Sequence, residues 1–444
     1  MNNIIRIFFA WIILLGGVFA QTDNVITLEE CVRTAIENNH IHKQALLNKE
    51  KADEQVDEAI GTSVMPKIDG TANYTNALQR GVFRIETPAF SGTFPMGSKH
   101  TLTAGISVEQ PLFTGAMFLA VQIAETYAEV TKKAADYSED DLILQVRQAY
   151  YTYLLAESFV KLADHQIKRA EENKKNTEIM YKAGLIAEYD YIRANVTYQN
   201  LIPEKTGAVN QQKQAMNNLK LVMGLQLDHA LTVLDSLVYN EIQLPEYQDK
   251  VDSLIAKNNL IQQMELQTEL QDLNASYEWT KHLPELQAFG NWQTQALEEQ
   301  FTPFDWDYFN SMNVGLSLRI PIFKGFATNS RVQQAEIDFK ISEENLINTK
   351  ETIKNNFENV ILQIKKSEEQ VNAYKISVDQ AERGYQIAIK RFNTGLGTQL
   401  EVTDALGALI SSQVNYLQSV YDYQLNHARL DLITGKNLDE IEFN

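Results

Sequence analysis

The sequence has few of the residues from which disulfide scaffolds and catalytic centres are built. Its 444 residues include one cysteine, Cys31, so no disulfide framework and no cysteine-based metal cluster can form within the chain. The seven histidines are mostly isolated, and no H-E-x-x-H helix, nucleophile elbow or phosphate-binding loop occurs. The sequence therefore predicts a protein that is not an enzyme and that holds no metal and no cofactor.

Positive charge is also scarce. Lysine and arginine number 39 against 58 aspartates and glutamates, which gives a formal net charge of -19. Binding to phosphates needs a basic face, so this balance argues against a nucleic-acid partner.

Long apolar runs are absent after the first twenty residues. Arg6 precedes a nearly continuous apolar segment at 7–18, and Ala20 offers a small residue for cleavage, so residues 1–20 are predicted to be a signal peptide. No later stretch approaches the ~20 apolar residues that a membrane-spanning helix needs. A secreted chain of this kind can be periplasmic, extracellular or a β-barrel.

The remainder of the chain contains the same sequence pattern twice. Gln110–Gly115 recurs as Ile320–Gly325, and Gly184 recurs as Gly395 at an offset of 211 residues. Glu37-Asn38-Asn39 likewise matches Lys257-Asn258-Asn259, at an offset of 220 residues. Ordered repetition at a nearly constant offset indicates an internal tandem duplication.

Each copy is predicted to contain a helix, two strands, a long helix, a glycine tip and a return helix. The predicted domains are 21–230 (a first helix at about 28–61, strands at about 67–80 and 101–112, long helix about 117–183, tip 184–190, return helix to 223), a linker at 231–250, 251–435 (a first helix at about 248–281, strands at about 284–296 and 311–322, long helix about 327–392, tip 393–400, return helix to 433) and a C-terminal tail at 436–444.

The long helices have the apolar spacing of coiled coils. In the first copy the apolar seam starts at Leu142, Val146, Ala149 and Tyr153, in alternating steps of four and three residues. A sustained repeat of 3.5 residues predicts left-handed helix packing. A helix over 117–182 would be roughly 100 Å long at 1.5 Å per residue, so it must bridge a long distance.

The strand segments alternate between apolar and polar residues. Residues 101–112 and 311–322 show this most clearly, and 67–76 and 285–294 show it more weakly. Period two predicts strands with one apolar and one polar face. Four strands cannot close a barrel, but three chains supply twelve, which is enough to close around a wet lumen. A periplasmic sheet packed on helices is the alternative.

Aromatic residues in the strand connections favour the barrel. The loops at about 77–100 and 295–311 carry Phe83, Phe90, Phe94, Phe301, Phe304, Trp306, Tyr308 and Phe309. Such residues beside membrane strands are typical of the lipid–water interface. Pro111 and Pro321 are predicted to end the second and fourth strands, and Gly115 and Gly325 to allow the tight turn into each long helix.

These motifs together resemble the TolC family of outer-membrane efflux proteins, over about residues 21–435. The motifs are the two strand-to-helix turns and the two tips, Tyr181–Asp190 and Arg391–Ala405. The resemblance implies an α+β membrane protein. Three chains would form a twelve-stranded β-barrel with four strands per chain, continued by a long α-helical coiled-coil barrel. Residues 231–250 would form an equatorial linker.

The resemblance also implies partners and a location. The homotrimer would lie in outer-membrane lipid of a Gram-negative bacterium, with a large periplasmic portion. It would join a periplasmic adaptor (membrane fusion) protein and an inner-membrane pump of RND or ABC type, in a tripartite efflux or type I secretion system. The alternative function is a periplasmic or surface coiled-coil scaffold without a pore.

The same resemblance assigns roles at the tips. Gly184, Leu185, Gly395 and Leu396 would dock the adaptor. Glu401 and Asp404, three residues apart on one helix face, match acidic positions at the narrowest point of the duct. Asp190 matches a family aspartate that holds the tip closed. The family's arginine and tyrosine partners are replaced here by Gly397 and Phe392, so Arg391 or Arg193 would have to substitute.

Overall fold

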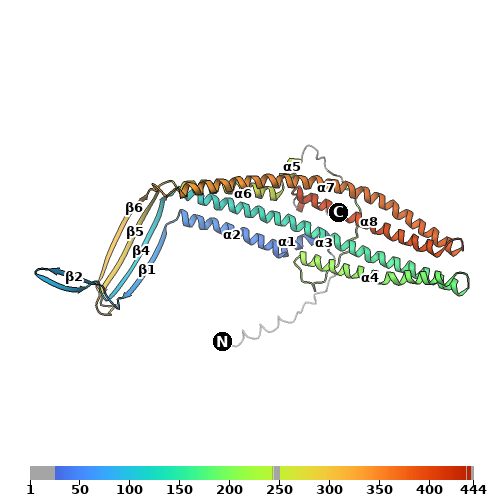
Figure 1. Ribbon diagram of the computed structural model, residues 1–444, viewed down its shortest axis with the longest axis horizontal. Helices are drawn as coiled ribbons and strands as arrows, with labels where there is room; N and C mark the ends of the chain where they lie inside the picture. Colours follow the sequence, from blue (N-terminus) through green and yellow to red (C-terminus); the bar gives the residue numbers. More distant parts are fainter. Residues whose placement is uncertain (1–25, 243, 245–250, 437, 442–444) are drawn as a thin grey trace, which may run out of the picture. The chain divides into compact units, whose positions relative to one another are not determined.

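The computed structural model describes residues 26–242, 244, 251–436 and 438–441 (Figure 1). The predicted signal peptide lies outside these residues, as do residues 243 and 245–250 of the linker and residues 437 and 442–444 of the C-terminal tail. Among the described residues, no helix combines the length and the apolarity needed to cross a membrane.

The same succession of elements occurs twice along the chain. The elements in order are α1 (Leu28–Asn38), α2 (His40–Ser63), β1 (Lys67–Asn76), β2 (Val82–Thr87), β3 (Phe90–Pro95), β4 (His100–Phe113), α3 (Met117–Lys182), α4 (Glu188–Val222), α5 (Val251–Ile255), α6 (Asn259–Thr280), β5 (Glu285–Glu298), β6 (Tyr308–Arg319), α7 (Ala327–Asn393), α8 (Gln399–Ile433) and a 3-10 turn at Leu438–Glu440.

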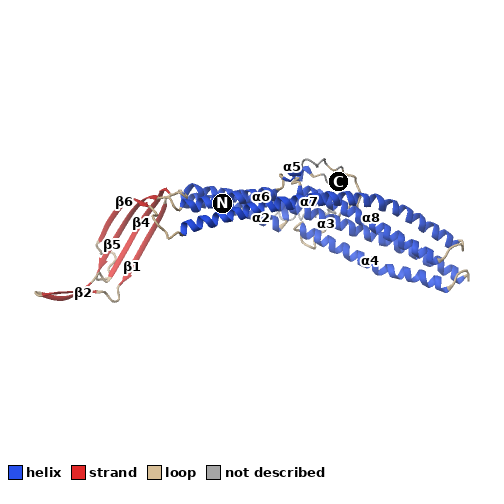
Figure 2. Ribbon diagram, turned by 45° about the horizontal axis from the view of Figure 1, so that its top comes forward, coloured by secondary structure: helices blue, strands red, loops and turns tan. Residues whose placement is uncertain are grey.

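The chain forms two compact units, each built from both halves of the sequence. One unit contains the described residues up to Gln44 together with Tyr137–Asn258 and those from Ile353 onward, and it is mainly helical. The other contains Ala45–Asp136 and Asn259–Thr352, and it carries all the strands (Figure 2).

The main sheet has four antiparallel strands in the order β1-β4-β5-β6. Its register places apolar residues side by side, as in the row Ile68, Val108, Gly290 and Val314. The neighbouring rows are polar, for example Asp69, Ser107, Asn291 and Asn313. One face of the sheet is therefore largely apolar and the other largely polar, as the alternation of the sequence predicts.

The apolar face of the sheet is uncovered in the single chain. On β6 the side chains of Met312, Val314 and Leu316 are 73%, 75% and 68% exposed. In the described part of the chain, β1 pairs only with β4 and β6 only with β5, so each has one edge without a partner strand. An apolar face and two open edges would be unstable in water for an isolated subunit.

Several boundary predictions are wrong. The connection at 77–100 is not a plain loop, because β2 and β3 pair within it as a separate hairpin, with Phe83 opposite Phe94. Pro111 does not end its strand: β4 continues to Phe113, and the pairing register shifts between these two residues. A bulge of this kind tolerates a proline because the missing N–H is not needed there. Pro321 does lie beyond the end of β6.

The first helix of each copy is broken, which the sequence did not indicate. Asn39 separates α1 from α2, and its backbone is extended there. Its side-chain oxygen accepts from the N–H groups of Ile41 and His42 at 2.8 and 3.1 Å, so it starts α2. Asn258 lies at the same place before α6, which corrects the predicted offset for this part of the chain from 220 to 219 residues.

Trp306 is not an interface residue in the single chain. Its ring is 6% exposed and lies against the rings of Tyr74, His100 and Phe301. Its indole nitrogen donates to the Gln300 carbonyl at 3.0 Å. This aromatic cluster closes the connections at one end of the sheet.

The predicted seam of the long helices is buried within the helical unit. In α3, Val146 and Ala149 pack with Leu219 of α4, and in α7, Phe357 and Ile364 pack with residues of α8. All four helix ends stop in the same way: the glycines Gly184, Gly224, Gly395 and Gly435 have φ between +61 and +74. That conformation favours glycine because it has no Cβ.

A buried charged group links α3 and α8. Arg147 Nη1 lies 2.7 Å from Asp431 Oδ2, and the two side chains are 4% and 13% exposed. Lys436 also approaches Asp431, at 2.8 Å. The nearby His427 is 5% exposed, and burial lowers the pKa of its imidazole to about 4, with Arg147 and Lys436 lowering it further and Asp431 opposing them.

The glycines that end the return helices should be less replaceable than those at the tips. A Cβ on Gly224 would lie 2.5 Å from the Asn38 carbonyl oxygen, whereas a Cβ on Gly184 would meet nothing within 4 Å. Gly184→Ala should cost about 1 kcal/mol for its backbone conformation alone. Gly224→Ala should cost roughly 1–3 kcal/mol more for the overlap. Thermal unfolding followed by circular dichroism in detergent measures both, and equal midpoints would contradict this packing.

Acid should weaken the helical unit through His427. The folded pKa of about 4 lies below the ordinary 6.5, so the unfolded chain takes up the proton first as the pH falls. Stability should therefore decrease between pH 6.5 and 4 and level off below that range. His427→Gln should flatten this part of the unfolding-midpoint profile, and the exposed His165→Gln should not. Parallel profiles for all three proteins would disprove the assignment.

Candidate functional site

The two tips that the sequence singles out are built alike. The first connects α3 to α4 and the second connects α7 to α8. The N–H of Leu185 donates to the Met180 carbonyl at 2.9 Å, and the N–H of Leu396 donates to the Arg391 carbonyl at 2.9 Å. Each bond closes the last helical turn around a glycine in the left-handed conformation, as in a Schellman motif. The structure therefore places both predicted glycines at turns.

The tips also pack on each other. Phe392, Val402 and Leu406 of the second tip form a buried cluster, and Met180 and Ile186 of the first tip lie against it. The predicted docking residues Leu185 and Leu396 project away from this cluster and are 72% and 73% exposed. The apolar cluster thus fixes the two turns side by side and leaves one leucine of each turn free.

Glu401 and Asp404 lie in the first two turns of α8, and both are exposed in the single chain. The N–H of Glu401 donates to Thr398 Oγ1 at 3.3 Å, which caps the helix. Glu401 Oε2 also lies 3.5 Å from Arg391 Nε, across the turn. An exposed ion pair of this kind contributes little to stability, so both carboxylates are available to the solvent.

The structure does not give Asp190 either of its expected substitute partners. Arg193 Nη2 donates to the hydroxyl of Tyr189 at 2.5 Å, and Arg391 contacts Glu401 and the Leu396 carbonyl. Among the described residues, no ion pair involves Asp190. Any group that holds Asp190 must come from outside the single chain or from another conformation.

The departures from the family pattern at the second tip have structural reasons. Phe392 is 3% exposed and belongs to the apolar cluster, so it packs where a tyrosine would bring a hydroxyl. A Cβ on Gly397 would lie 3.0 Å from the Cβ of Arg391 and 3.1 Å from Glu401 Oε2. The absence of a side chain there makes room for the Arg391–Glu401 contact. Sequence reasoning missed this contact because its residues are ten apart across a turn.

The buried amide of Gln399 is a feature of the second tip that the sequence did not reveal. Gln399 is fully buried, and neither its amide nitrogen nor its amide oxygen has a partner among the described residues. An unsatisfied buried amide costs stability, so the apolar packing around Gln399 has to offset that cost.

The strand-to-helix turns show why glycine is needed in two different ways. At Gly115 a Cβ would lie 2.7 Å from Leu283 Cδ1, so the first turn needs space. At Gly325, φ is +60, and Phe326 after it also has a positive φ of 65, so the second turn needs an unusual backbone. Pro321 and Phe326 line a hollow of about 130 Å³ beside this turn.

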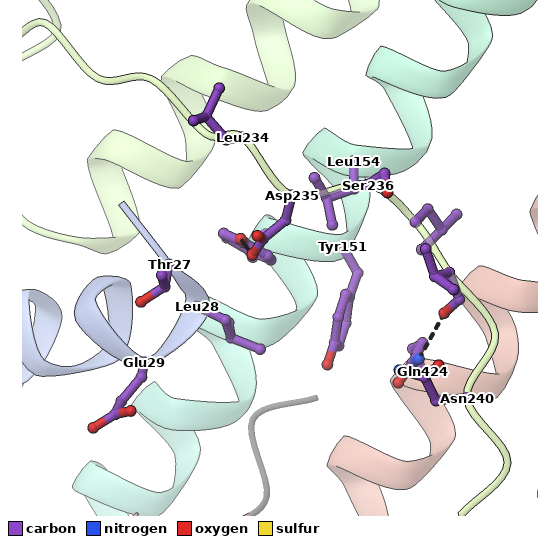
Figure 3. Close-up of a pocket in the computed structure, with 13 residues that line it drawn as sticks. Thr27, Leu28, Glu29, Tyr151, Leu154, Leu234, Asp235, Ser236, Asn240 and Gln424 are labelled. Atoms are coloured by element: carbon purple, nitrogen blue, oxygen red, sulfur yellow. Dashed lines mark hydrogen bonds between the residues drawn. The ribbon is translucent and has the colours of Figure 1, made fainter. Parts of the chain in front are cut away.

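A larger cavity lies elsewhere, beside the N-terminus of α1 (Figure 3). Its volume is about 590 Å³, and the segment Leu234–Asn240 covers it against α3 and α8. Tyr150 donates a hydrogen bond to Asp235, and Gln424 Nε2 donates to the Val238 carbonyl at 3.1 Å. Burial and this aspartate raise the pKa of Tyr150, so its hydroxyl stays protonated and offers no base. These two hydrogen bonds hold the segment Leu234–Asn240 against α3 and α8.

The described residues contain no group of three or more histidine, cysteine, aspartate or glutamate side chains placed to hold a metal ion. Cys31 is fully buried, and burial raises the pKa of its thiol to about 12. A thiol of that kind is a packing residue and not a nucleophile.

Comparison with known proteins places these features in one family. The family model described as outer membrane efflux protein matches residues 31–225 and 251–436, which covers both copies. The chain is 22% identical to outer membrane protein TolC of Escherichia coli K12 over 435 residues, spanning 94% of this chain and 83% of that protein. It is 22% identical to the alkaline protease secretion protein AprF of Pseudomonas aeruginosa, spanning 76% of this chain and 70% of that protein.

The fold is also that of a solved channel. The crystal structures of CusC superpose with a TM-score of 0.78 at 16% identity, covering 93% of this chain and 92% of that chain. The expected resemblance is confirmed: the chain belongs to the outer membrane efflux protein family, whose members are transport channels of the outer membrane and not enzymes.

Proposed function

We propose that this chain is one of three identical subunits of an export duct that crosses the outer membrane and extends into the periplasm. The duct is the outer-membrane component of an efflux or type I secretion system. The duct is a passive conduit, as in the family of transport channels to which the chain belongs.

The observation that carries the proposal is the state of the β1-β4-β5-β6 sheet. Its apolar face suits contact with lipid, and its polar face suits a water-filled lumen. Because the four strands alternate in direction, β1 of one copy is antiparallel to β6 of the next when the sheets are placed edge to edge. Three sheets then close into twelve antiparallel strands without an open edge, as a bilayer requires.

The second part of the proposal is the tandem duplication. Two copies of one unit, at residues 21–230 and 251–435, account for the repeated elements and for the four glycine-ended helices. In a trimer the two copies supply six hairpins of α3–α4 and α7–α8 type, which continue the barrel as a helical tube. The described part of the linker, residues 231–242, then lies around the middle of the tube.

The tips are the proposed gate and docking site. Glu401 and Asp404 from three chains supply six carboxylates at one level, and Asp190 lies on the neighbouring tip. A ring of carboxylates attracts cations and repels anions. The exposed Leu185 and Leu396, with Gly184 and Gly395, form the surface for a periplasmic adaptor protein, which is joined to an inner-membrane pump of RND or ABC type. Similarity to TolC and to AprF supports both uses.

The ring should set the ion selectivity of the duct. Glu401→Ala combined with Asp404→Ala should lower cation preference and weaken block by multivalent cations in planar bilayers, because six negative charges are removed from the constriction. The matched control is Asp338→Ala with Glu343→Ala, two exposed acids of α7 outside the tips. Equal selectivity in the wild-type and ring variants would place these residues away from the constriction.

The exposed leucines should be needed for docking and not for assembly. Leu185→Glu with Leu396→Glu should reduce export by an order of magnitude or more, because buried apolar anchors dominate protein interfaces. The amount of protein inserted in the membrane should stay unchanged. Leu78→Glu, at a 95% exposed leucine after β1, is the control. Full export by the double variant would show that the adaptor binds elsewhere.

A further inference from the structure

The two halves of the helical unit are equivalent in their packing. Gly224 ends the return helix of the first half and Gly435 that of the second, with φ of +71 and +61. Asn39 donates to the carbonyl of the last residue of α4 at 2.8 Å, and Asn258 donates to that of the last residue of α8 at 3.2 Å. An offset of 211 residues therefore relates positions on α3 and α4 to positions on α7 and α8.

Polar contacts join the two halves within the chain. They come from α3 of the first half and from α7 and α8 of the second. The pairs are Arg147 Nη1 with Asp431 Oδ2 at 2.7 Å, Thr152 Oγ1 with the Tyr421 hydroxyl at 3.2 Å, Gln166 Nε2 with Gln413 Oε1 at 2.7 Å, and Arg169 Nη1 with Glu382 Oε2 at 2.8 Å.

The joined surfaces of the two halves are different from each other. If a two-fold axis related the halves, the Arg147–Asp431 pair would have a mate within the chain, between Lys220 and Glu358 at the equivalent positions. Lys220 Nζ instead donates to the Leu227 carbonyl at 3.0 Å, and among the described residues no ion pair involves Glu358. The contact is therefore head-to-tail, which leaves one head and one tail open on every chain.

We propose that Glu358 on α7 of one copy forms an ion pair with Lys220 on α4 of a second copy of this chain. This contact is the equivalent, at the offset of 211, of the pair Arg147–Asp431 within the chain. It rests on the proposed trimer, since three head-to-tail contacts close a ring. The charges are reversed between the two contacts. Within the chain α3 carries the base, Arg147, whereas between chains the equivalent helix α7 carries the acid, Glu358.

Two of the other three contacts have chemically matched equivalents as well; Gln166–Gln413 does not, because its equivalents are Ser377 and Ile202. Thr152–Tyr421 corresponds to Gln363 with Asn210, and Arg169–Glu382 corresponds to Gln380 with Glu171 of the second copy. All four of these equivalent residues are exposed in the single chain. An amide can donate to an amide or to a carboxylate, so each pair can form a hydrogen bond.

The reversal of charge gives the assembly its order. A first half placed against another first half would bring Arg147 against Lys220, and a second half against another second half would bring Glu358 against Asp431. Both arrangements put like charges together, which disfavours them. Only alternation of first and second halves pairs opposite charges at every contact, so the ring closes from whole chains in one orientation.

Cross-linking tests the contact directly. The variant carries Lys220→Cys and Glu358→Cys and is treated in detergent with a short bismaleimide. The native Cys31 does not react, because it is fully buried and burial raises its thiol pKa to about 12. The control pairs Lys220→Cys with Asn356→Cys, an exposed position two residues away on the other side of α7.

The inference predicts dimer and trimer bands on a denaturing gel for the test variant and at least tenfold less product for the control. Light scattering on the same samples measures the mass of the particle and so distinguishes a wrong contact from a wrong oligomeric state. A trimeric particle that yields only monomer bands would overturn the Lys220–Glu358 contact and leave the export duct standing. A monomeric particle in detergent would overturn the proposed trimer itself.

Charge reversal provides a second readout that loss of folding cannot imitate. Lys220→Glu and Glu358→Lys, each alone, should speed dissociation of the trimer on the order of tenfold, since disrupting a charge pair that is buried in an interface acts mainly on the dissociation rate. The double variant should return the rate to that of the wild type. Failure of the double variant to recover, with both single variants impaired, would contradict a direct pair.

Discussion

The whole structure depends on a sheet that cannot be satisfied within one chain. Its four strands expose apolar side chains on one face, and β1 and β6 each leave one row of backbone groups without a partner strand in the described chain. Unpaired backbone groups cost several kcal/mol each in lipid, so the sheet has to meet further strands before it can lie in a membrane. The proposed trimer, its closed barrel and its lumen all rest on this constraint.

The helical unit forms long packed helices with few kinds of contact. Both halves stop their helices with glycine and pack a seam of small and aromatic residues, so one structural solution is used twice. Where the halves meet, buried charge is added to apolar packing, as at Arg147 and Asp431. Buried pairs add little net stability compared with apolar residues, but they are selective for register. That selectivity suits an assembly in which first and second halves have to alternate.

Much of this architecture was predictable because it is periodic. The bounds of α3 and α7 and the existence of β4 follow from spacings of 3.5 and two residues, and the tip glycines follow from the end of the helical pattern. The hairpin of β2 and β3 was missed because the glycines and proline around Phe90 look like a loop. The break at Asn39 was missed because no glycine or proline marks it.

Contacts between residues far apart in the sequence could not be predicted from any sequence pattern. Arg147 and Asp431 are 284 residues apart, and Tyr150 donates a hydrogen bond to Asp235, which lies in a segment without regular structure. Predicting them needs the offset between the halves and the path of the linker, which only the fold supplies. The same reason explains the second tip. In the sequence, Gly397 and Phe392 replace an arginine and a tyrosine of the family and so remove two polar side chains. In the structure, Gly397 makes room for the Arg391–Glu401 contact, and Phe392 belongs to the apolar cluster.

The central claim, that copies of this chain combine their strands into one closed cylinder in lipid, is tested most directly by native mass spectrometry of protein recovered from floated lipid vesicles. The account predicts that the vesicle fraction contains particles of three chains and that few single chains float. Protein that remains in the aqueous fraction as single chains would contradict it.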